Sequence, residues 1–276
     1  MRRLLTSIVA YLCFMGLANS QYLELGLLLG GSNYGGELQY KTIEDREIHL
    51  SMGAFARYNM SKYLTVRVHA LKTTISGTDF NANLNVESRS RNLSFESSIL
   101  ELGAQAELNI FGVDIMDKKG SSFYVFGGVA GFKFNPKAEL NGTFHELQPL
   151  GTEGQNLSGS KYGLISIAFP FGIGAKINLS YRINIGLEMG FRHTLTDYLD
   201  DVSTQYPDLN ALQSADPIAA ALSYRTPELD PSAEPNPVGI TRGDPSNKDR
   251  YMIGSATISY NLGNKKKLEY NSKFKW

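Results

Sequence analysis

The chain of 276 residues carries 27 basic and 27 acidic residues, so its formal net charge at pH 7 is zero. This balance excludes the basic field on which nucleic-acid binding depends, and we expect no nucleic-acid partner. The one cysteine, Cys13, lies in an N-terminal apolar segment, which excludes disulfides, thiolate metal sites and a cysteine nucleophile elsewhere in the chain.

Residues 1–20 have the organisation of a secretory signal peptide. Arg2 and Arg3 precede a short apolar stretch, residues 4–17, and small residues follow at Ala18 and Ser20. The stretch is too short for a comfortable membrane-spanning helix, and its flanks are typical of an export signal. We expect cleavage after Ser20, with a retained membrane anchor as the alternative.

Eight segments that alternate apolar and polar residues follow the signal peptide. They span residues 22–29, 48–58, 64–70, 100–109, 124–133, 165–179, 181–191 and 252–262. A period of two indicates β-strands whose two faces meet different surroundings. After Ser20 there is no run of 18 apolar residues, so a transmembrane helix is excluded.

The lengths and spacing of these segments favour a membrane barrel over a soluble sandwich or a lipocalin-like barrel. Several segments are longer than the 5–6 residues usual in soluble sheets and can cross a bilayer when tilted. Short links (59–63 and Ser180) and a moderate one (112–122) alternate with long ones (32–47, 76–92, 135–162 and 196–250). The sequence therefore predicts an all-β fold, an eight-stranded antiparallel transmembrane β-barrel over residues 21–262.

Ten charged residues are expected to line the barrel interior. They are Glu24, Arg57, Arg67, Glu101, Glu107, Lys133, Lys176, Arg182, Glu188 and Arg192. Eight strands enclose a space only wide enough for side chains, and unpaired charges in it would be costly. We therefore predict a plug of salt bridges rather than a pore.

Residues 197–249 form the longest loop, which cannot be barrel wall because it holds seven of the chain's ten prolines. Ten acidic and three basic residues give it a net charge of −7. We expect a solvated, partly disordered outer loop, with contact to a partner or a divalent cation as the alternative. The base of this loop carries the motif Thr196, Asp197, Tyr198, Asp200 and Asp201. The motif lacks the spacing of an EF-hand, and we expect no metal and no cofactor. We expect Arg192 to form an ion pair with Asp197 or Asp200.

The C-terminal tail, residues 263–276, reads GNKKKLEYNSKFKW and has a net charge of +4. An even number of strands would place it in the periplasm beside the mature N-terminus. One interpretation is a basic flap at anionic lipid. The other is a docking peptide for a periplasmic partner, anchored by Lys265, Lys266, Lys267, Lys273, Lys275 and Trp276.

Catalytic signals are weak. His49 and His69 fall on inward positions and are expected to be hydrogen-bonded fillers. His193 ends a strand near Thr194, Asp197 and Ser203, where a barrel enzyme acting on lipids would place its residues. No G-x-S-x-G or H-E-x-x-H motif is present, so we expect no enzyme and no catalytic residue.

Five segments resemble a family of outer-membrane barrels of Bacteroidota, the DUF6089 family, which includes PorG-like components of type IX secretion and gliding. They read LELGLLLGGSNYGGEL, GAFARYNMSKYLTVRVHAL, RNLSFESSILELGAQAELNIF, FYVFGGVAGFKFNPKA and GLEMGFRHTLTDYLDDVS, the last being the most specific. The resemblance implies an eight-stranded barrel without enzymatic activity, some members of which anchor a periplasmic ring to the outer membrane.

Our hypothesis is a monomeric outer-membrane barrel with a structural or anchoring role, surrounded by outer-membrane lipid. Its short turns and both termini would be periplasmic and its long loops extracellular. A periplasmic secretion-ring component or lipoprotein would be the partner. The alternatives are an envelope-stabilising barrel of the OmpA type, a lipid-modifying barrel enzyme and a small passive channel.

Overall fold

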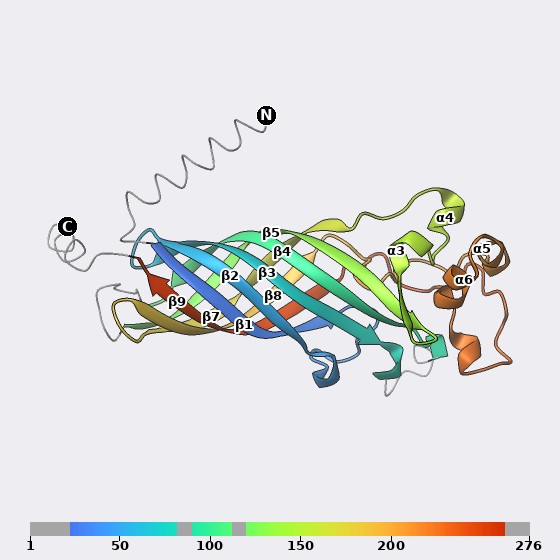
Figure 1. Ribbon diagram of the computed structural model, residues 1–276, viewed down its shortest axis with the longest axis horizontal. Helices are drawn as coiled ribbons and strands as arrows, with labels where there is room; N and C mark the ends of the chain where they lie inside the picture. Colours follow the sequence, from blue (N-terminus) through green and yellow to red (C-terminus); the bar gives the residue numbers. More distant parts are fainter. Residues whose placement is uncertain (1–22, 82–89, 112–119, 263–276) are drawn as a thin grey trace, which may run out of the picture.

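A computed structural model describes residues 23–81, 90–111 and 120–262 (Figure 1). The strands are β1 (Leu23–Gly35), β2 (His49–Asn59), β3 (Leu64–Thr78), β4 (Ser94–Asn109), β5 (Ser121–Leu140), β6 (Thr143–Glu146), β7 (Ile165–Asn178), β8 (Ile183–Thr194) and β9 (Arg250–Asn261). The α-helices are α3 (Leu147–Leu150), α4 (Gln155–Ser158), α5 (Leu209–Ala215) and α6 (Pro217–Ser223), and the 3-10 helices are η2 (Asp45–Glu47), η3 (Asp79–Asn81) and η4 (Thr226–Glu228).

Eight of these strands close into one antiparallel barrel, which confirms the predicted fold. The order is β4-β3-β2-β1-β9-β8-β7-β5, and the pairing of β4 with β5 completes the circle. The first and last strands meet at a seam that runs from the pair Glu24 and Asn261 to the pair Gly35 and Arg250. The short strand β6 pairs only with the far end of β5.

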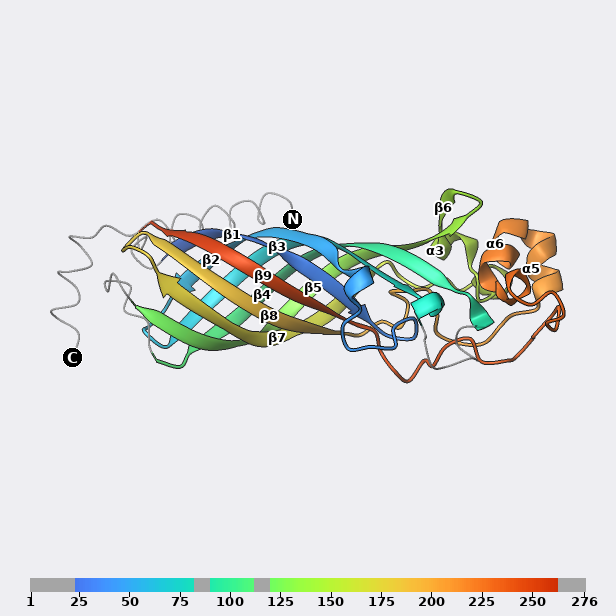
Figure 2. The same ribbon diagram turned by 90° about the horizontal axis from the view of Figure 1, so that it is seen from below.

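The two ends of the barrel differ. Short turns, residues 60–63 and 179–182, join β2 to β3 and β7 to β8 at one end. The long connections, with α3, α4, α5 and α6, all gather at the other end, as Figures 1 and 2 show. We call this the loop-bearing end. The predicted signal peptide, residues 1–20, and the basic tail, residues 263–276, lie outside the described residues.

None of the helices in the described part of the chain is long and apolar enough to cross a membrane. The outward side chains of the eight barrel strands, by contrast, are apolar and exposed. Examples are Leu27 (62%), Leu102 (70%), Ile173 (62%) and Leu187 (68%). A soluble protein does not leave such a continuous apolar surface in water, whereas lipid chains are a suitable environment for it.

The inward face of β5 differs from the prediction. Tyr124, Phe126 and Phe132 are buried inside the barrel, and Val125, Val129 and Lys133 are exposed on its outer face. Glycines on the neighbouring strands make room for the rings. A Cβ at Gly174 would lie 2.3 Å from the Tyr124 ring, and one at Gly172 would lie 2.7 Å from the Phe126 ring. Aromatic side chains thus fill part of the interior that the sequence pattern assigned to Lys133.

The segment 197–249 is folded, which corrects the expectation of a solvated and partly disordered loop. Leu212 and Ala219, from α5 and α6, pack together in a small buried cluster. Two of the ten acids are helix caps: the Asp208 carboxylate accepts from the N–H groups at the start of α5, and Asp216 does the same for α6, where Pro217 is the first residue. Capping and a proline at the first helical position explain locally why two short helices form here.

Candidate functional site

The barrel interior holds two groups of charged side chains, and ion pairs and hydrogen bonds connect the members of each group. In the first, the Glu188 carboxylate accepts from Arg57 Nη2 at 2.7 Å and from Arg67, and Glu107 accepts from Arg57 Nε at 2.9 Å. Lys176 Nζ lies 3.9 Å from Glu107. Each carboxylate therefore faces at least two cations, and all five side chains are buried.

The second group lies nearer the loop-bearing end and centres on Glu101. Its carboxylate contacts His69 Nε2 at 2.6 Å, Arg192 Nε at 3.5 Å and the Tyr251 hydroxyl. Arg192 also donates to the Gly190 carbonyl at 2.9 Å. The expected pairing of Arg192 with Asp197 or Asp200 is therefore wrong. The reason is geometric, because Arg192 occupies an inward position on β8 and reaches Glu101 across the barrel.

Eight of the ten residues expected inside are buried there: Glu24, Arg57, Arg67, Glu101, Glu107, Lys176, Glu188 and Arg192. The prediction that Lys133 and Arg182 lie inside the barrel is wrong. Lys133 is on the outer face of β5, for the reason given above, and Arg182 is exposed in the turn between β7 and β8, where it donates to the Tyr260 hydroxyl. Glu24, at the turn end, accepts from Asn59 at 2.6 Å and from Ser259 at 2.9 Å.

These side chains leave little free space between the two groups. The cavity lined by Arg67, His69, Phe126, Glu188 and Arg192 has a volume of about 10 Å³. That volume holds roughly one water molecule. The described part of the barrel thus has a filled interior and no continuous channel at this level.

We expect the reconstituted barrel to show no unitary conductance steps in a planar lipid bilayer at high salt. The described part of the interior is filled by side chains, and its buried carboxylates are paired with cations, so an ion meets a closed path there. A porin reconstituted in the same bilayer serves as the positive control. Regular conductance steps from the pure protein would contradict the filled interior.

At the loop-bearing end, acidic residues of the loop base meet a tyrosine of β1. The Tyr34 hydroxyl oxygen lies 2.7 Å from Asp200 Oδ2 and 2.7 Å from Asp249 Oδ1. One hydroxyl has one proton to donate, so the second contact needs a proton on a carboxyl group. Burial first, and then neighbouring carboxylates, raise the pKa of Asp200 and of Asp249 well above the usual range. A shared proton therefore holds the two aspartates and Tyr34 together.

Glycine is required beside this cluster. A Cβ at Gly36 would lie 1.9 Å from the Tyr34 hydroxyl oxygen and 2.2 Å from Asp249 Oδ1. The next residue, Glu37, offers a carboxylate oxygen within 4.8 Å of those of Asp200 and Asp249. Oxygen donors of this kind suit Ca²⁺ or Mg²⁺, so these three are the described residues that could hold a cation. The hydrogen bonds of Tyr34, Val202 N–H and Leu199 N–H nevertheless satisfy the two aspartates with protons alone.

The rest of the loop-base motif ties the loops to one another. Asp197 accepts from the Ser203 hydroxyl at 2.7 Å, and Tyr198 stacks on Tyr162 with ring centroids 4.3 Å apart. The Thr196 carbonyl accepts from the Asp249 N–H at 3.1 Å. The motif therefore acts as a joint between the loop before β7 and the loop before β9.

Asp201 completes this joint through Arg242. The Asp201 carboxylate accepts from the Tyr162 hydroxyl at 2.5 Å and lies 3.8 Å from the Arg242 guanidinium. Arg242 also pairs with Glu153 at 2.9 Å and donates to the Ser223 carbonyl at 3.2 Å. Sequence reasoning missed Tyr34, Glu153 and Arg242. The one signal for Arg242 is that it is one of only three bases in an acidic loop.

We expect the folded loops to lose stability as the pH rises. Burial raises the pKa of Asp197 and of Asp201 to about 6, and that of Glu37 to about 7. A carboxyl group whose pKa is higher in the folded state contributes stability below its unfolded pKa, and this contribution is lost as the pH rises through the folded value. Hydrogen exchange of residues 197–249, corrected for intrinsic rates, should show protection falling by on the order of 2 kcal/mol from about pH 5 to about pH 8.

The barrel strands provide the internal control for this measurement, because their amides should keep their protection over the same range. Protection of the loops that rises with pH would contradict the raised pKa values of Asp197, Asp201 and Glu37. It would mean that Arg242 and its neighbours stabilise the charged carboxylates more than burial destabilises them.

The residues weighed for catalysis are not brought together. His193 is exposed on the outer face of β8, whereas Ser203 is buried in the joint with its hydroxyl bound to Asp197. His49 and His69 contact Ser76 Oγ and Glu101, both at 2.6 Å. Within the described residues, therefore, His193 has no serine and carboxylate arranged around it as a nucleophilic site would require.

A closed barrel with an apolar outer band, a charged and filled interior and long loops at one end defines an outer-membrane β-barrel. More specifically, the chain belongs to the family described as Domain of unknown function (DUF6089), whose model matches residues 2–216. No curated protein sequence matches this chain.

Solved structures with a similar fold share little sequence with the chain. Neisserial surface protein A is 9% identical, with a TM-score of 0.42 over 87% of this chain and 96% of that one. Ail of Yersinia pestis, in complex with the heparin analogue sucrose octasulfate, is 9% identical, with a TM-score of 0.39 over 86% and 96%. The N-terminal barrel of Pseudomonas aeruginosa OprF is 8% identical, with a TM-score of 0.35 over 86% and 96%.

Proposed function

We propose that this protein is a structural barrel that anchors a periplasmic assembly to the outer membrane, as PorG-like components do in type IX secretion and gliding. In this proposal the loop-bearing end faces the outside of the cell and the short turns face the periplasm, the usual arrangement of such barrels. The bacterium would belong to the Bacteroidota.

The observation that carries the proposal is the filled interior. Glu107 and Glu188 form ion pairs with Arg57, Arg67 and Lys176 across the interior, and among the described residues the space beside them has a volume of only about 10 Å³. The role of the protein then depends on its outer surfaces rather than on its interior. This favours a structural component over a channel.

The C-terminal tail supplies the surface for a partner at the turn end. The last described contact of the chain is the hydrogen bond from the Leu262 N–H to the Leu23 carbonyl, where β9 ends beside the start of β1. The end of β9 thus lies at the end of the barrel opposite the long loops. Five lysines against one glutamate follow, with aromatic residues among them. Lysine contacts and an aromatic anchor are a common means of binding a protein surface.

A pull-down from native outer membranes in mild detergent tests the proposal. The full chain is compared with a chain that ends at Leu262, and with a full-length variant in which Lys265, Lys266 and Lys267 are replaced by Gln. Heat-modifiable migration on a gel verifies that all three form the barrel. We expect the full chain to retain periplasmic or lipoprotein partners and the shortened chain to lose them.

If the lysine variant loses part of the bound partner, the contact depends on the charge of the lysines. If it retains all of the partner while the shortened chain loses it, the contact depends on the aromatic residues of the tail. Recovery of the same abundant membrane proteins with all three chains would remove the anchoring role. The protein would then be a stand-alone envelope barrel of the OmpA type.

A further inference from the structure

We propose that the outer face of β8 and β9, together with the loop after β1, forms a binding site for the phosphate group of a phosphorylated glycolipid in the surrounding membrane leaflet. Arg250 and His193 would contact the phosphate, and Phe171, Phe191 and Met252 would contact the first part of an acyl chain. The choice of a glycolipid rests on the orientation proposed above, because the loop-bearing end then lies in the outer leaflet.

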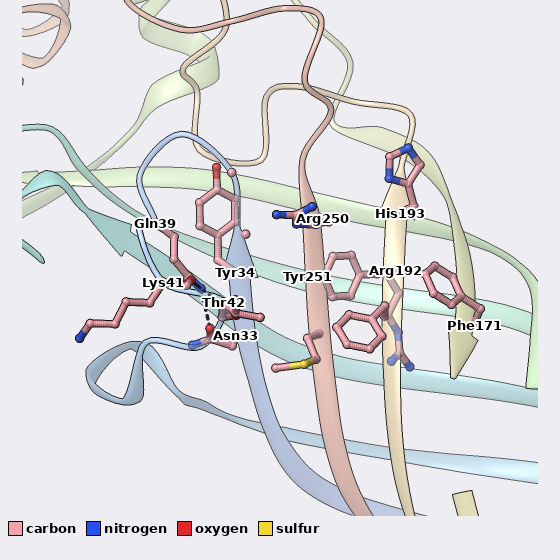
Figure 3. A pocket seen from close by; sticks show the side chains of 14 residues that line it. Asn33, Tyr34, Gln39, Lys41, Thr42, Phe171, Arg192, His193, Arg250 and Tyr251 are labelled. Atoms are coloured by element: carbon pink, nitrogen blue, oxygen red, sulfur yellow. Dashed lines mark hydrogen bonds between the residues drawn. The ribbon is translucent and has the colours of Figure 1, made fainter. Parts of the chain in front are cut away.

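A groove of about 380 Å³ lies at this place (Figure 3). One wall is the loop after β1, with Gln39, Lys41 and Thr42, and the floor is formed by residues of β7, β8 and β9, most of which face outward. Figure 3 shows Arg250 and His193 near the loop-bearing ends of β9 and β8. The groove is thus on the outside of the barrel, open to the membrane.

The wall exists because the loop folds back over the outer face of β1. By its position in the strand, Asn33 faces outward, as Leu27 and Leu29 do, yet it is buried. Its side-chain amide donates to the Glu44 carbonyl at 2.8 Å, and its oxygen accepts from Gln39 Nε2 at 2.9 Å. A polar segment held in this way marks the height at which the apolar band of the barrel ends.

At the level of this polar segment, the side chains of Arg250 and His193 have no partner among the described residues. Arg250 and His193 are directly paired in the register of β9 and β8, and both are exposed. Neither makes a hydrogen bond or an ion pair with any described residue. Arg250 lies across Gly35, since a Cβ there would be 3.0 Å from its Nε, and so its side chain extends toward the loop wall.

The charges around the groove favour an anion. Its lining residues include Lys41, Arg192, His193 and Arg250 and no acidic residue. Arg192 is turned inward to Glu101, and Lys41 is paired with Glu44 at 3.0 Å, so Arg250 is the cation that remains available. The planar guanidinium group is well suited to two parallel hydrogen bonds with a phosphate.

The floor below these residues is apolar and matches the other half of an amphiphile. The rings of Phe171 and Phe191 stack with centroids 5.8 Å apart, and Met252 lies beside Phe191 across the strand pair. Further along the same strands the outward residues are Ile173, Met189 and Leu187, all apolar and exposed. An acyl chain that descends from a phosphate at Arg250 therefore meets only apolar side chains.

Binding of lipid A to the purified full-length barrel in detergent micelles, measured by native mass spectrometry, tests the site. The probes are lipid A with its phosphates, the same lipid A after both phosphates have been removed, and inorganic phosphate. The variants are Arg250→Gln, His193→Gln and, as a matched control, Lys133→Gln, which removes an exposed cation on the outer face of β5. Heat-modifiable migration verifies that each variant is folded.

We expect phosphorylated lipid A to bind the native chain and Lys133→Gln equally. Arg250→Gln should weaken the binding about tenfold, which corresponds to the loss of one charge-assisted contact, and His193→Gln should weaken it less. Lipid A without phosphates should bind all variants alike and weakly. Inorganic phosphate should not compete at the concentrations at which the lipid binds, because it lacks the acyl chains.

Three results would overturn the proposal. Equal losses in Arg250→Gln and Lys133→Gln would mean general attraction to an anionic micelle. Equal binding of both forms of lipid A would remove the phosphate contact, and effective competition by inorganic phosphate would leave an ion site without a lipid. The micelles contain no periplasmic protein and impose no orientation, so none of these results bears on the anchoring role.

Discussion

Replacing Glu188 by leucine lowers the free energy of unfolding of the barrel by about 3–5 kcal/mol, because two buried guanidinium groups lose a partner. Arg57 and Arg67 both contact this carboxylate, and Tyr124 donates to it as well. After the substitution Glu107 is the carboxylate that still contacts Arg57, Arg67 and Lys176. Water cannot enter freely to solvate the excess positive charge, since the interior is filled.

The measurement is urea unfolding of the protein in lipid vesicles, followed by the gel shift between folded and unfolded barrel. Glu146→Gln is the matched control. Its ion pair with Lys137 at 3.3 Å is exposed, so its loss should change the stability by less than about 1 kcal/mol. The double variant Arg57→Met with Glu188→Leu should recover part of the loss, as expected for coupled sites. A loss below about 1 kcal/mol for Glu188→Leu would show that the charge network does not hold the interior together.

The second large effect concerns the loops. Arg242→Met should destabilise the folded loops by about 3–5 kcal/mol, because Glu153 and Asp201 are left as buried charges without their cation. The Arg242 side chain is only 2% exposed, and its guanidinium group joins three separate parts of the chain, through Glu153, Asp201 and the Ser223 carbonyl. Methionine retains much of the volume of arginine, so the main loss is that of charge and hydrogen bonds.

Limited proteolysis of the folded barrel provides the measurement. We expect cleavage within residues 197–249 to become much faster in Arg242→Met, while the gel shift of the barrel itself is unchanged. Arg225→Met is the control, since its pair with Glu228 at 2.9 Å lies at the surface, where Glu228 is 43% exposed. Equal cleavage of the two variants would contradict the role given to Arg242.

The sequence predicted the barrel well because a transmembrane strand has two chemically opposite faces. On β8, Leu187 and Met189 alternate with Glu188 and Gly190, and the structure keeps this division. The pattern was misleading on β5, where both faces carry apolar residues and only the lysine and the glycines distinguished them. Space for Tyr124 and Phe126 comes from glycines on other strands, and a single segment does not reveal it.

The candidate sites were predicted less completely, for a related reason. The acids of the loop base are conspicuous in the sequence, but their partners are not. Tyr34 is separated from Asp200 by 166 positions and from Asp249 by 215. Alternation also says nothing about Asn33, which is polar at an outward position and is buried only because the next loop folds over it.

The seam between β1 and β9 has a consequence for the order of assembly. It joins the two ends of the barrel sequence, and polar contacts pin both of its ends: Glu24 to Ser259, 235 positions apart, and Tyr34 to Asp249. Until β9 is synthesised and pairs, β1 has an unpaired edge, and the inward charges lack an enclosing wall that would shield them from lipid. Closure of the barrel therefore depends on contacts of very long sequence separation, which are slow to form. A chain interrupted within the final strand would lack the partner that covers the edges of β1 and β8.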